Sequence, residues 1–277
     1  MTSSRNALLL LLFAPVAFFT AFFLVPMAVV LVSSLVTAEA HRPTLAHYGR
    51  VLLDRYHWDV LWVTFRIGFI STALCTMIGF PLAWYLVRIV RLPAWRRICV
   101  ILIVVPLFTS NIVRSFGWMV LLGRTGIVND TLLLTGAVER PIRFLGNELG
   151  ILIGLVYILL PFMVIAVGNG LAKIDVAYEQ ASFDLGAGPV RTFWFVTLPL
   201  CLPATLSGAI IVFSLAVSAY VTPALLSGGR ITVFSMLIFQ QYSSLFDFHF
   251  GAALSITLLI LTLALVAAAS HIGDRGR

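Results

Sequence analysis

Residues 173–203 read KIDVAYEQASFDLGAGPVRTFWFVTLPLCLP and lie between two long apolar runs. The segment is polar although its neighbours are not, because it contains charged side chains: Lys173, Asp175, Glu179, Asp184 and Arg191. An unpaired charge is costly to bury in hydrocarbon. We therefore expect this segment to lie at a membrane face, where it is accessible to a partner protein.

The same segment contains the residues that start and end two short helices. Asp175 can cap the start of the first helix, and Glu179, one turn later, forms an approximate capping pair with it. Gly186 can end that helix in a left-handed conformation, and the Gly188–Pro189 pair can begin the second. Pro199 is predicted to stop the second helix and turn the chain back into the membrane. The pattern alone fits a docking element and an ordinary interhelical loop equally well.

The composition is that of an integral membrane protein. Of the 277 residues, 61% are hydrophobic and 10% are charged, and the mean hydropathy is +1.06. A soluble domain keeps roughly a quarter of its residues charged. The formal charge of +7 would also suit nucleic acid, but the arginines lie beside apolar runs, which indicates membrane orientation and no nucleic-acid partner. Cys75, Cys99 and Cys201 lie in or beside these runs, so no disulfide is expected.

Six apolar runs are long enough to cross a bilayer, which needs about 20 residues per helix. The predicted spans are residues 7–32, 58–87, 98–122, 149–171, 200–226 and 250–270. The sequence Ala38-Glu39-Ala40 after the first run mimics a signal-peptidase site. However, that run is longer than the apolar core of a signal peptide, about 7–15 residues. We therefore predict that the first span is retained.

The chain lacks the residue patterns of catalysis and of cofactor binding. Its one lysine, Lys173, precedes isoleucine, so no phosphate-binding Gly-Lys-Ser/Thr loop exists and any use of ATP must fall to a partner. The spacing of His41, His47 and His57 fits no metal motif, which favours a solvated loop. No catalytic constellation and no clear Asp or Glu within a span is found, so we expect neither an enzyme nor a proton-coupled transporter.

The basic residues predict the orientation. With the N-terminus inside, the inner side holds nine of them: Arg5, Arg88, Arg91, Arg96, Arg97, Lys173, Arg191, Arg275 and Arg277. The outer side holds seven: Arg42, Arg50, Arg55, Arg124, Arg140, Arg143 and Arg230. The four arginines of the short 88–97 loop decide the orientation, because short loops dominate topology. Both termini and segment 173–203 are therefore expected in the cytoplasm.

A polar face is expected on the fifth span. Ser207, Ser214, Ser218 and Thr222 recur at helical spacing, and Tyr220 is adjacent to them. Such residues can line a path for a solute. Small hydroxyl residues also let membrane helices pack closely, and this structural role is the favoured interpretation.

Two arginines lie within or near the predicted spans. Arg66 is only a turn or two into its span, so we expect its side chain to snorkel to the interface. Arg114 is deeper, where a charge is costly, and is the better candidate for a structural ion pair or for a residue of a wet path.

Segment 173–203 resembles the cytoplasmic coupling loop of ABC importer permeases, whose signature is EAA-x3-G-x9-I-x-L-P. The triplet falls on Gln180-Ala181-Ser182, and the later positions on Gly186, Val196 and Leu198-Pro199. Gln replaces the leading acid, Ser replaces the second alanine, and an acid stands one place early. The resemblance implies that the ATPase-coupling residues are Glu179, Gln180, Ala181, Ser182, Asp184, Gly186, Leu198 and Pro199.

Four further stretches resemble the first permease subunit of spermidine/putrescine-type ABC importers: residues 106–114, 118–123, 126–129 and 220–226. The resemblance implies an all-α type I importer fold with six spans and a coupling helix. It also implies a second permease subunit, a cytoplasmic ATPase dimer and a periplasmic solute-binding protein. Possible path residues are Arg114, Trp118, Ser214, Ser218, Tyr220 and Thr222, whose aromatic members can bind a cation.

The sequence therefore predicts a multi-pass permease of a bacterial inner membrane, for polyamines or for a related small amine or zwitterion. Residues 1–58 would form the first span and a periplasmic loop, residues 59–271 the permease domain, and residues 272–277 a cytoplasmic tail. The alternatives are a secondary transporter or channel that works without ATP, an ABC permease for ferric iron, phosphonate, opine or thiamine, and, remotely, a membrane enzyme.

Overall fold

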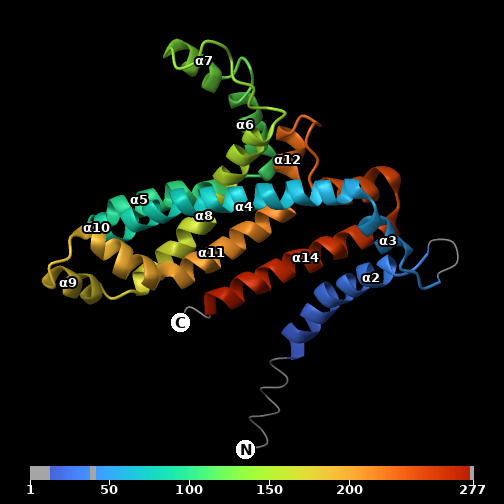
Figure 1. Ribbon diagram of the computed structural model, residues 1–277, viewed down its shortest axis with the longest axis horizontal. Coiled ribbons are helices and arrows are strands. Elements are labelled where there is room, and N and C mark those ends of the chain that lie inside the picture. Colours follow the sequence, from blue (N-terminus) through green and yellow to red (C-terminus); the bar gives the residue numbers. More distant parts are fainter. Residues whose placement is uncertain (1–12, 38–41, 275–277) are drawn as a thin grey trace, which may run out of the picture. The chain divides into compact units, whose positions relative to one another are not determined.

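The computed structural model describes residues 13–37 and 42–274, which form helices joined by short loops (Figure 1). Within this part of the chain we find no β-strand, only an isolated bridge between Val36 and Pro43. The all-α prediction is confirmed. The start of the predicted first span, the triplet at residues 38–40, Arg5, His41, Arg275 and Arg277 lie outside the described residues.

The chain divides into two compact units. Among the described residues, 13–37, 42–58 and 237–261 form the first unit, which contains η1 (Thr20–Leu24), α2 (Val25–Ser34), α3 (Ala46–Leu53), η5 (Gln241–Leu245) and the start of α14 (Phe248–Asp274). In this unit the Arg50 guanidinium lies 4.3 Å from the centre of the Phe250 ring, and Nδ1 of His249 lies 2.8 Å from the Ser33 carbonyl oxygen. These contacts join α2, α3 and α14.

The second unit, residues 59–236 and 262–274 of the described chain, contains the remaining helices. They are α4 (Arg55–Trp84), η2 (Tyr85–Ile89), α5 (Pro93–Val104), η3 (Val105–Phe108), α6 (Asn111–Leu121), α7 (Ile127–Leu134), α8 (Glu148–Lys173), α9 (Val176–Asp184), α10 (Pro189–Thr192), η4 (Phe193–Thr197), α11 (Leu198–Ser218), α12 (Val221–Leu226) and α13 (Phe234–Gln240). Helix α4 begins, and α13 ends, a few residues beyond this unit. The domain boundaries suggested by the sequence stay a prediction.

Helices α8 and α11 form the core of the second unit and run side by side (Figure 1). Small residues at their contact bring the backbones close together. A Cβ added at Gly170 would lie 2.2 Å from the Cβ of Ala204, and one added at Gly208 would lie 2.8 Å from the Cβ of Ala166. Membrane helices associate through such close contacts, because lipid is as apolar as the side chains that a core would bury.

The third span was predicted as one continuous helix over residues 98–122, and this is wrong because the helix is broken within that range. The helical stretch Pro93–Phe108 ends in a 3₁₀ turn that contains Pro106, and α6 then leaves at an angle of 102° (Figure 1). Proline favours a break here because it has no N–H for the helix ladder. Ser110 then starts a new helix, since its hydroxyl accepts a hydrogen bond from the Ile112 N–H.

Pro199 does not stop the second helix of segment 173–203, so this prediction is also wrong. The helix runs unbroken from Pro189 to Ser218. The π turn η4 ends at Thr197, two residues before Pro199, and the Leu198 N–H donates to the Phe193 carbonyl. A π turn takes up the irregularity that proline introduces into the hydrogen-bond ladder, so the helix can continue.

The fifth span ends earlier than predicted, and Thr222 is not on the helical face of Ser214 and Ser218. Helix α11 ends at Ser218, the backbone is extended at Ala219, and α12 begins at Val221. Pro223 causes this break because it offers no N–H to the Ala219 carbonyl. That carbonyl accepts a hydrogen bond of 2.7 Å from the Ser235 hydroxyl instead.

Within residues 13–37 and 42–274, five unbroken helical stretches are long and apolar enough to cross a membrane: Phe13–Ser34, Arg55–Ile89, Glu148–Lys173, Pro189–Ser218 and Phe248–His271. The predicted total of six spans is reached when the bent pair α5–α6 counts as one span.

The orientation can be tested with reporter fusions. A fusion after Arg91, in the arginine-rich loop before α5, should report the cytoplasm, and one after Arg230 should report the periplasm. The reason is that short loops rich in arginine stay on the inner side. Alkaline phosphatase and a cytoplasmically active reporter at both positions would measure this, and the same side for both would refute the orientation.

Candidate functional site

Helix α9 is a short helix with well-defined ends. The Asp175 carboxylate accepts a hydrogen bond of 2.9 Å from the Ala177 N–H, so the predicted cap is confirmed. At the other end Gly186 has a φ of +84°, its N–H donates to the Phe183 carbonyl, and the Ala187 N–H donates to the Ser182 carbonyl. This pair of bonds is the Schellman motif, which requires a left-handed residue and therefore favours glycine.

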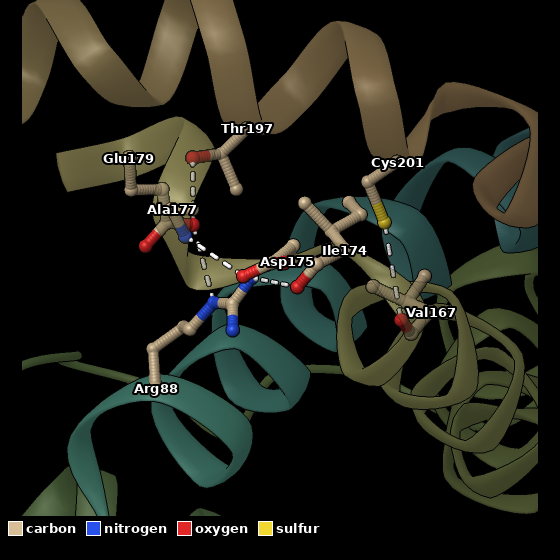
Figure 2. Close-up of polar contacts among 8 residues, drawn as sticks. All are labelled: Arg88, Val167, Ile174, Asp175, Ala177, Glu179, Thr197 and Cys201. Atoms are coloured by element: carbon tan, nitrogen blue, oxygen red, sulfur yellow. Dashed lines mark hydrogen bonds and ion pairs between the residues drawn. The ribbon is translucent and has the colours of Figure 1, made fainter. Parts of the chain in front are cut away.

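Glu179 does not complete a capping pair with Asp175, because its carboxylate is bound elsewhere in the chain. Oε1 accepts one hydrogen bond from Nε of Arg88 and one from the Thr197 hydroxyl, each 3.1 Å long (Figure 2). Nη2 of Arg88 also donates to the Ile174 carbonyl at 3.0 Å. The side chains of Arg88 and Glu179 are only 12% and 14% exposed, so water screens this ion pair weakly.

These contacts fasten α9 to two membrane helices of the same unit. Arg88 belongs to η2, the last turn of the Arg55–Ile89 stretch, and Thr197 belongs to η4 in the Pro189–Ser218 helix. A further hydrogen bond of 3.0 Å joins the hydroxyls of Ser182 and Thr192. Sequence reasoning counted Arg88 only as a topological charge and missed both Arg88 and Thr197 as partners of the loop. The available signal was a basic residue at the end of the second predicted span.

The outer surface of α9 and of the turn after it is open. Gln180, Ala181, Asp184 and Gly186 are exposed. Large apolar side chains beside them are exposed too: Tyr178, Phe183, Leu185, Val190, Trp194 and Phe195. Leu198 is half-buried and Pro199 is exposed. The predicted coupling residues therefore divide into an outward set and an inward set, the latter made of Glu179, Ser182 and Leu198.

The second unit contains a cavity of about 510 Å³. It is lined by residues at two helix breaks, the one between α5 and α6 and the one between α11 and α12. Its lining contains Leu107, Thr109, Asn111, Arg114, Leu155, Ile158, Leu159, Phe162, Leu215, Ser218, Ala219, Tyr220, Val221 and Thr222. The structure thus brings together four of the predicted path residues: Arg114, Ser218, Tyr220 and Thr222. The sequence patterns did not predict the contribution of α8, whose apolar side chains form one wall.

Two predicted path residues lie outside this lining. Trp118 packs edge-on against Tyr157, with ring centres 5.3 Å apart, and the Ser214 hydroxyl donates to the Ile210 carbonyl at 2.8 Å. Thr222 lines the cavity and also bonds Ser115, with the two hydroxyl oxygens 3.1 Å apart. This last contact holds α6 against α12.

The two span arginines differ in their partners. Arg66 forms an ion pair with Glu148, the first residue of α8, and that its side chain snorkels to the interface stays a prediction. The sequence patterns also gave no role to Glu148, an acid at the edge of a span. Arg114 donates one hydrogen bond to the side chain of Asn111, which lies one turn earlier on the same helix α6.

The class of protein that has this fold and these sites is identified by a match to a known family. Residues 76–271 match the family described as binding-protein-dependent transport system inner membrane component, and the chain belongs to this family. It is therefore a multi-pass protein of the inner membrane with the architecture of an ABC transporter permease.

Individual members of this family are similar to the chain over most of its length. The chain is 34% identical over 218 residues to the spermidine/putrescine transport system permease protein PotB of Escherichia coli K12, covering 79% of this chain and 78% of that protein. It is 32% identical to PotB of Haemophilus influenzae, covering 88% and 86%. The inner membrane ABC transporter permease protein YdcU of Escherichia coli K12 is 30% identical, covering 83% and 76%.

Solved structures agree with the fold. A chain of a bacterial ABC transporter for import of the acidic polysaccharide alginate superimposes with a TM-score of 0.82 at 17% identity, covering 98% of this chain and 96% of that chain. A chain of the MetNI methionine ABC transporter superimposes with a TM-score of 0.55 at 21% identity, covering 80% and 96%. The predicted type I importer fold is confirmed.

Proposed function

We propose that this chain is a permease subunit of an ATP-driven, binding-protein-dependent importer. It would work with a second permease subunit, a cytoplasmic ATPase dimer and a periplasmic solute-binding protein. The observation that carries the proposal is helix α9, capped at both ends, fastened to two spans through Arg88 and Thr197, and exposed on its outer surface. Such a helix is suited to transmit a movement between an outside partner and the membrane helices.

The proposed mechanism uses the contacts around Glu179. Closure of the ATPase dimer on ATP would displace α9, and the Arg88–Glu179–Thr197 cluster would pass that displacement to the ends of two spans. The helix that contains Thr197 continues to the break at Ala219, which lines the cavity. A displacement at one end of a rigid helix is transmitted to its other end, because packed helices move as bodies. Alternating access of the cavity would follow.

The proposed cargo is a small amine-bearing solute, a polyamine or a related zwitterion. Its support is the 34% identity to a spermidine/putrescine permease over 79% of the chain. The cavity volume, about 510 Å³, is in the range of sites for small ligands. Both the cargo and the cytoplasmic position of α9 are parts of this proposal.

The proposal is tested by reconstitution. The chain, co-expressed with the proposed partner subunits, should co-purify with the ATPase. In proteoliposomes that also receive the binding protein, uptake of a labelled amine should require ATP inside. Omission of the ATPase is the control and should abolish uptake. Uphill uptake by this chain alone, without ATP, would refute the importer and support a secondary transporter.

A further inference from the structure

The cavity between the two helix breaks carries a charge that suits only part of the proposed cargo class. Among the described residues that line it, one is charged, Arg114, and none is Asp or Glu. A cavity for a bare diamine would be expected to offer carboxylates, because two ammonium groups lose their hydration on entry. The lining instead carries a positive charge, which would repel an ammonium group.

The Arg114 guanidinium still has unused hydrogen-bonding capacity. One nitrogen, Nη2, donates to Asn111, but Nε and Nη1 are buried and have no hydrogen-bond partner within the described part of the chain. Buried donors of this kind are costly unless a ligand or another group satisfies them. A guanidinium presents its N–H groups as a planar fork, which matches the two oxygens of a carboxylate.

The start of helix α6 adds to the positive potential. Thr109 and Asn111, on either side of the Ser110 cap, both line the cavity, so the first turn of this 11-residue helix lies at its wall. Unpaired N–H groups and the helix dipole make such a terminus favourable for negative charge. Helix terminus and guanidinium therefore select the same kind of group.

Other parts of the lining offer hydrogen-bond acceptors. The Ser218 hydroxyl uses its proton on the Ser214 carbonyl at 2.9 Å, and the Thr109 hydroxyl uses its proton on the Pro106 carbonyl at 2.8 Å. A hydroxyl that donates to the backbone keeps its lone pairs free to accept. Both oxygens are thus suited to the N–H donors of an ammonium group.

We propose that this cavity binds a zwitterionic solute that carries both a carboxylate and an ammonium group. The carboxylate would contact the edge of the Arg114 guanidinium formed by Nη1 and the second proton of Nη2, and the ammonium would contact the oxygens of Ser218 and Thr109. A diamine of the same length would place a second positive charge against the guanidinium and bind more weakly. This inference rests on the proposed import function and narrows its cargo from amines in general to amino acids with separated charges.

The test measures binding to the permease itself, since a solute-binding protein has a selectivity of its own. The purified transporter complex without binding protein is titrated with labelled 4-aminobutanoate and labelled putrescine, which share a four-carbon chain and differ in one terminal group. The intact cavity should prefer 4-aminobutanoate. Arg114→Gln should weaken its binding about tenfold or more, the loss of one charge-assisted pair. Arg124→Gln removes an exposed arginine outside the cavity and should change nothing.

Charge reversal separates recognition from a structural role. Arg114→Glu should invert the preference, so that putrescine binds better than 4-aminobutanoate. Arg114→Lys keeps the positive charge but not the planar pair of N–H donors. It should still prefer 4-aminobutanoate, with a lower affinity. This variant provides the test if Arg114→Glu does not assemble. An equal loss of both ligands in assembled variants would assign Arg114 a structural role and overturn the inference.

The inference and the proposed function fail in different ways. Preferential binding of putrescine by the unaltered complex, together with ATP-dependent uptake of putrescine, would leave the importer standing and overturn the zwitterion site. Absence of ATP-dependent uptake of both solutes in the complete system would overturn the amine cargo, and with it the inference.

Discussion

Replacement of Gly186 by tryptophan should abolish transport and leave the membrane helices folded. Gly186 has a φ of +84°, and a non-glycine residue in this conformation costs about 1–2 kcal/mol. Apart from its two chain neighbours, no described residue would have an atom within 4 Å of a Cβ at this position, so the indole would point into the space where we propose that the ATPase docks. We expect uptake and ATPase binding to fall at least about tenfold, measured by co-purification and uptake in proteoliposomes.

The matched control is Gly186→Asn. Asparagine tolerates the left-handed conformation and is small, so it should retain most of the coupling. Normal membrane insertion of both variants would show that the loss does not come from unfolding of the spans. Normal assembly and full transport in Gly186→Trp would show that α9 is not the coupling element.

Removal of either partner of the Arg88–Glu179 pair should uncouple ATP hydrolysis from transport. Both side chains are nearly buried, and breaking such a pair leaves an unpaired charge, at a cost of about 3–5 kcal/mol when burial is complete. Glu179→Ala also removes the acceptor of Thr197, so α9 keeps only the Ser182–Thr192 hydrogen bond to the Pro189–Ser218 helix. We expect faster proteolytic cleavage in residues 174–188 and uptake reduced about tenfold or more.

A double-mutant cycle distinguishes a specific pair from a general loss of charge. If Arg88 and Glu179 act together, the Arg88→Ala/Glu179→Ala variant should lose less than the sum of the single variants. Arg91→Gln removes an exposed arginine of the same short loop and should leave uptake and cleavage unchanged. Additive losses, or an equal effect of Arg91→Gln, would contradict the proposed role of the pair.

The sequence was sufficient for the elements whose signal is local. Spans such as 149–171 were predicted within a few residues, because length and apolar composition alone decide whether a helix can cross a bilayer. The ends of α9 were predicted for a similar reason. An aspartate cap and a left-handed glycine act through atoms only a few residues away, and the structure has both.

The effect of each proline on its helix could not be predicted from the neighbouring residues alone. Pro199 was expected to end a helix and does not, whereas Pro106 and Pro223 accompany breaks. Each proline removes one N–H from the ladder, but whether the helix breaks or continues depends on groups distant in the sequence and on the local turn. The hydroxyl of Ser235 satisfies the carbonyl left free at Ala219, and a π turn takes up the irregularity before Pro199.

By itself, then, the sequence determined that the chain is a helical membrane protein with a capped helix between its fourth and fifth spans, since apolar length and caps are local properties. Only the tertiary structure decided which side of α9 faces inward, that Arg88 and Thr197 hold Glu179, and that Arg114 shares a cavity with Ser218 and Tyr220. Glu179 and Arg88 are 91 residues apart, and no sequence period connects them. Their contact exists because the packing of α4, α8 and α11 brings the ends of separate spans to the same place.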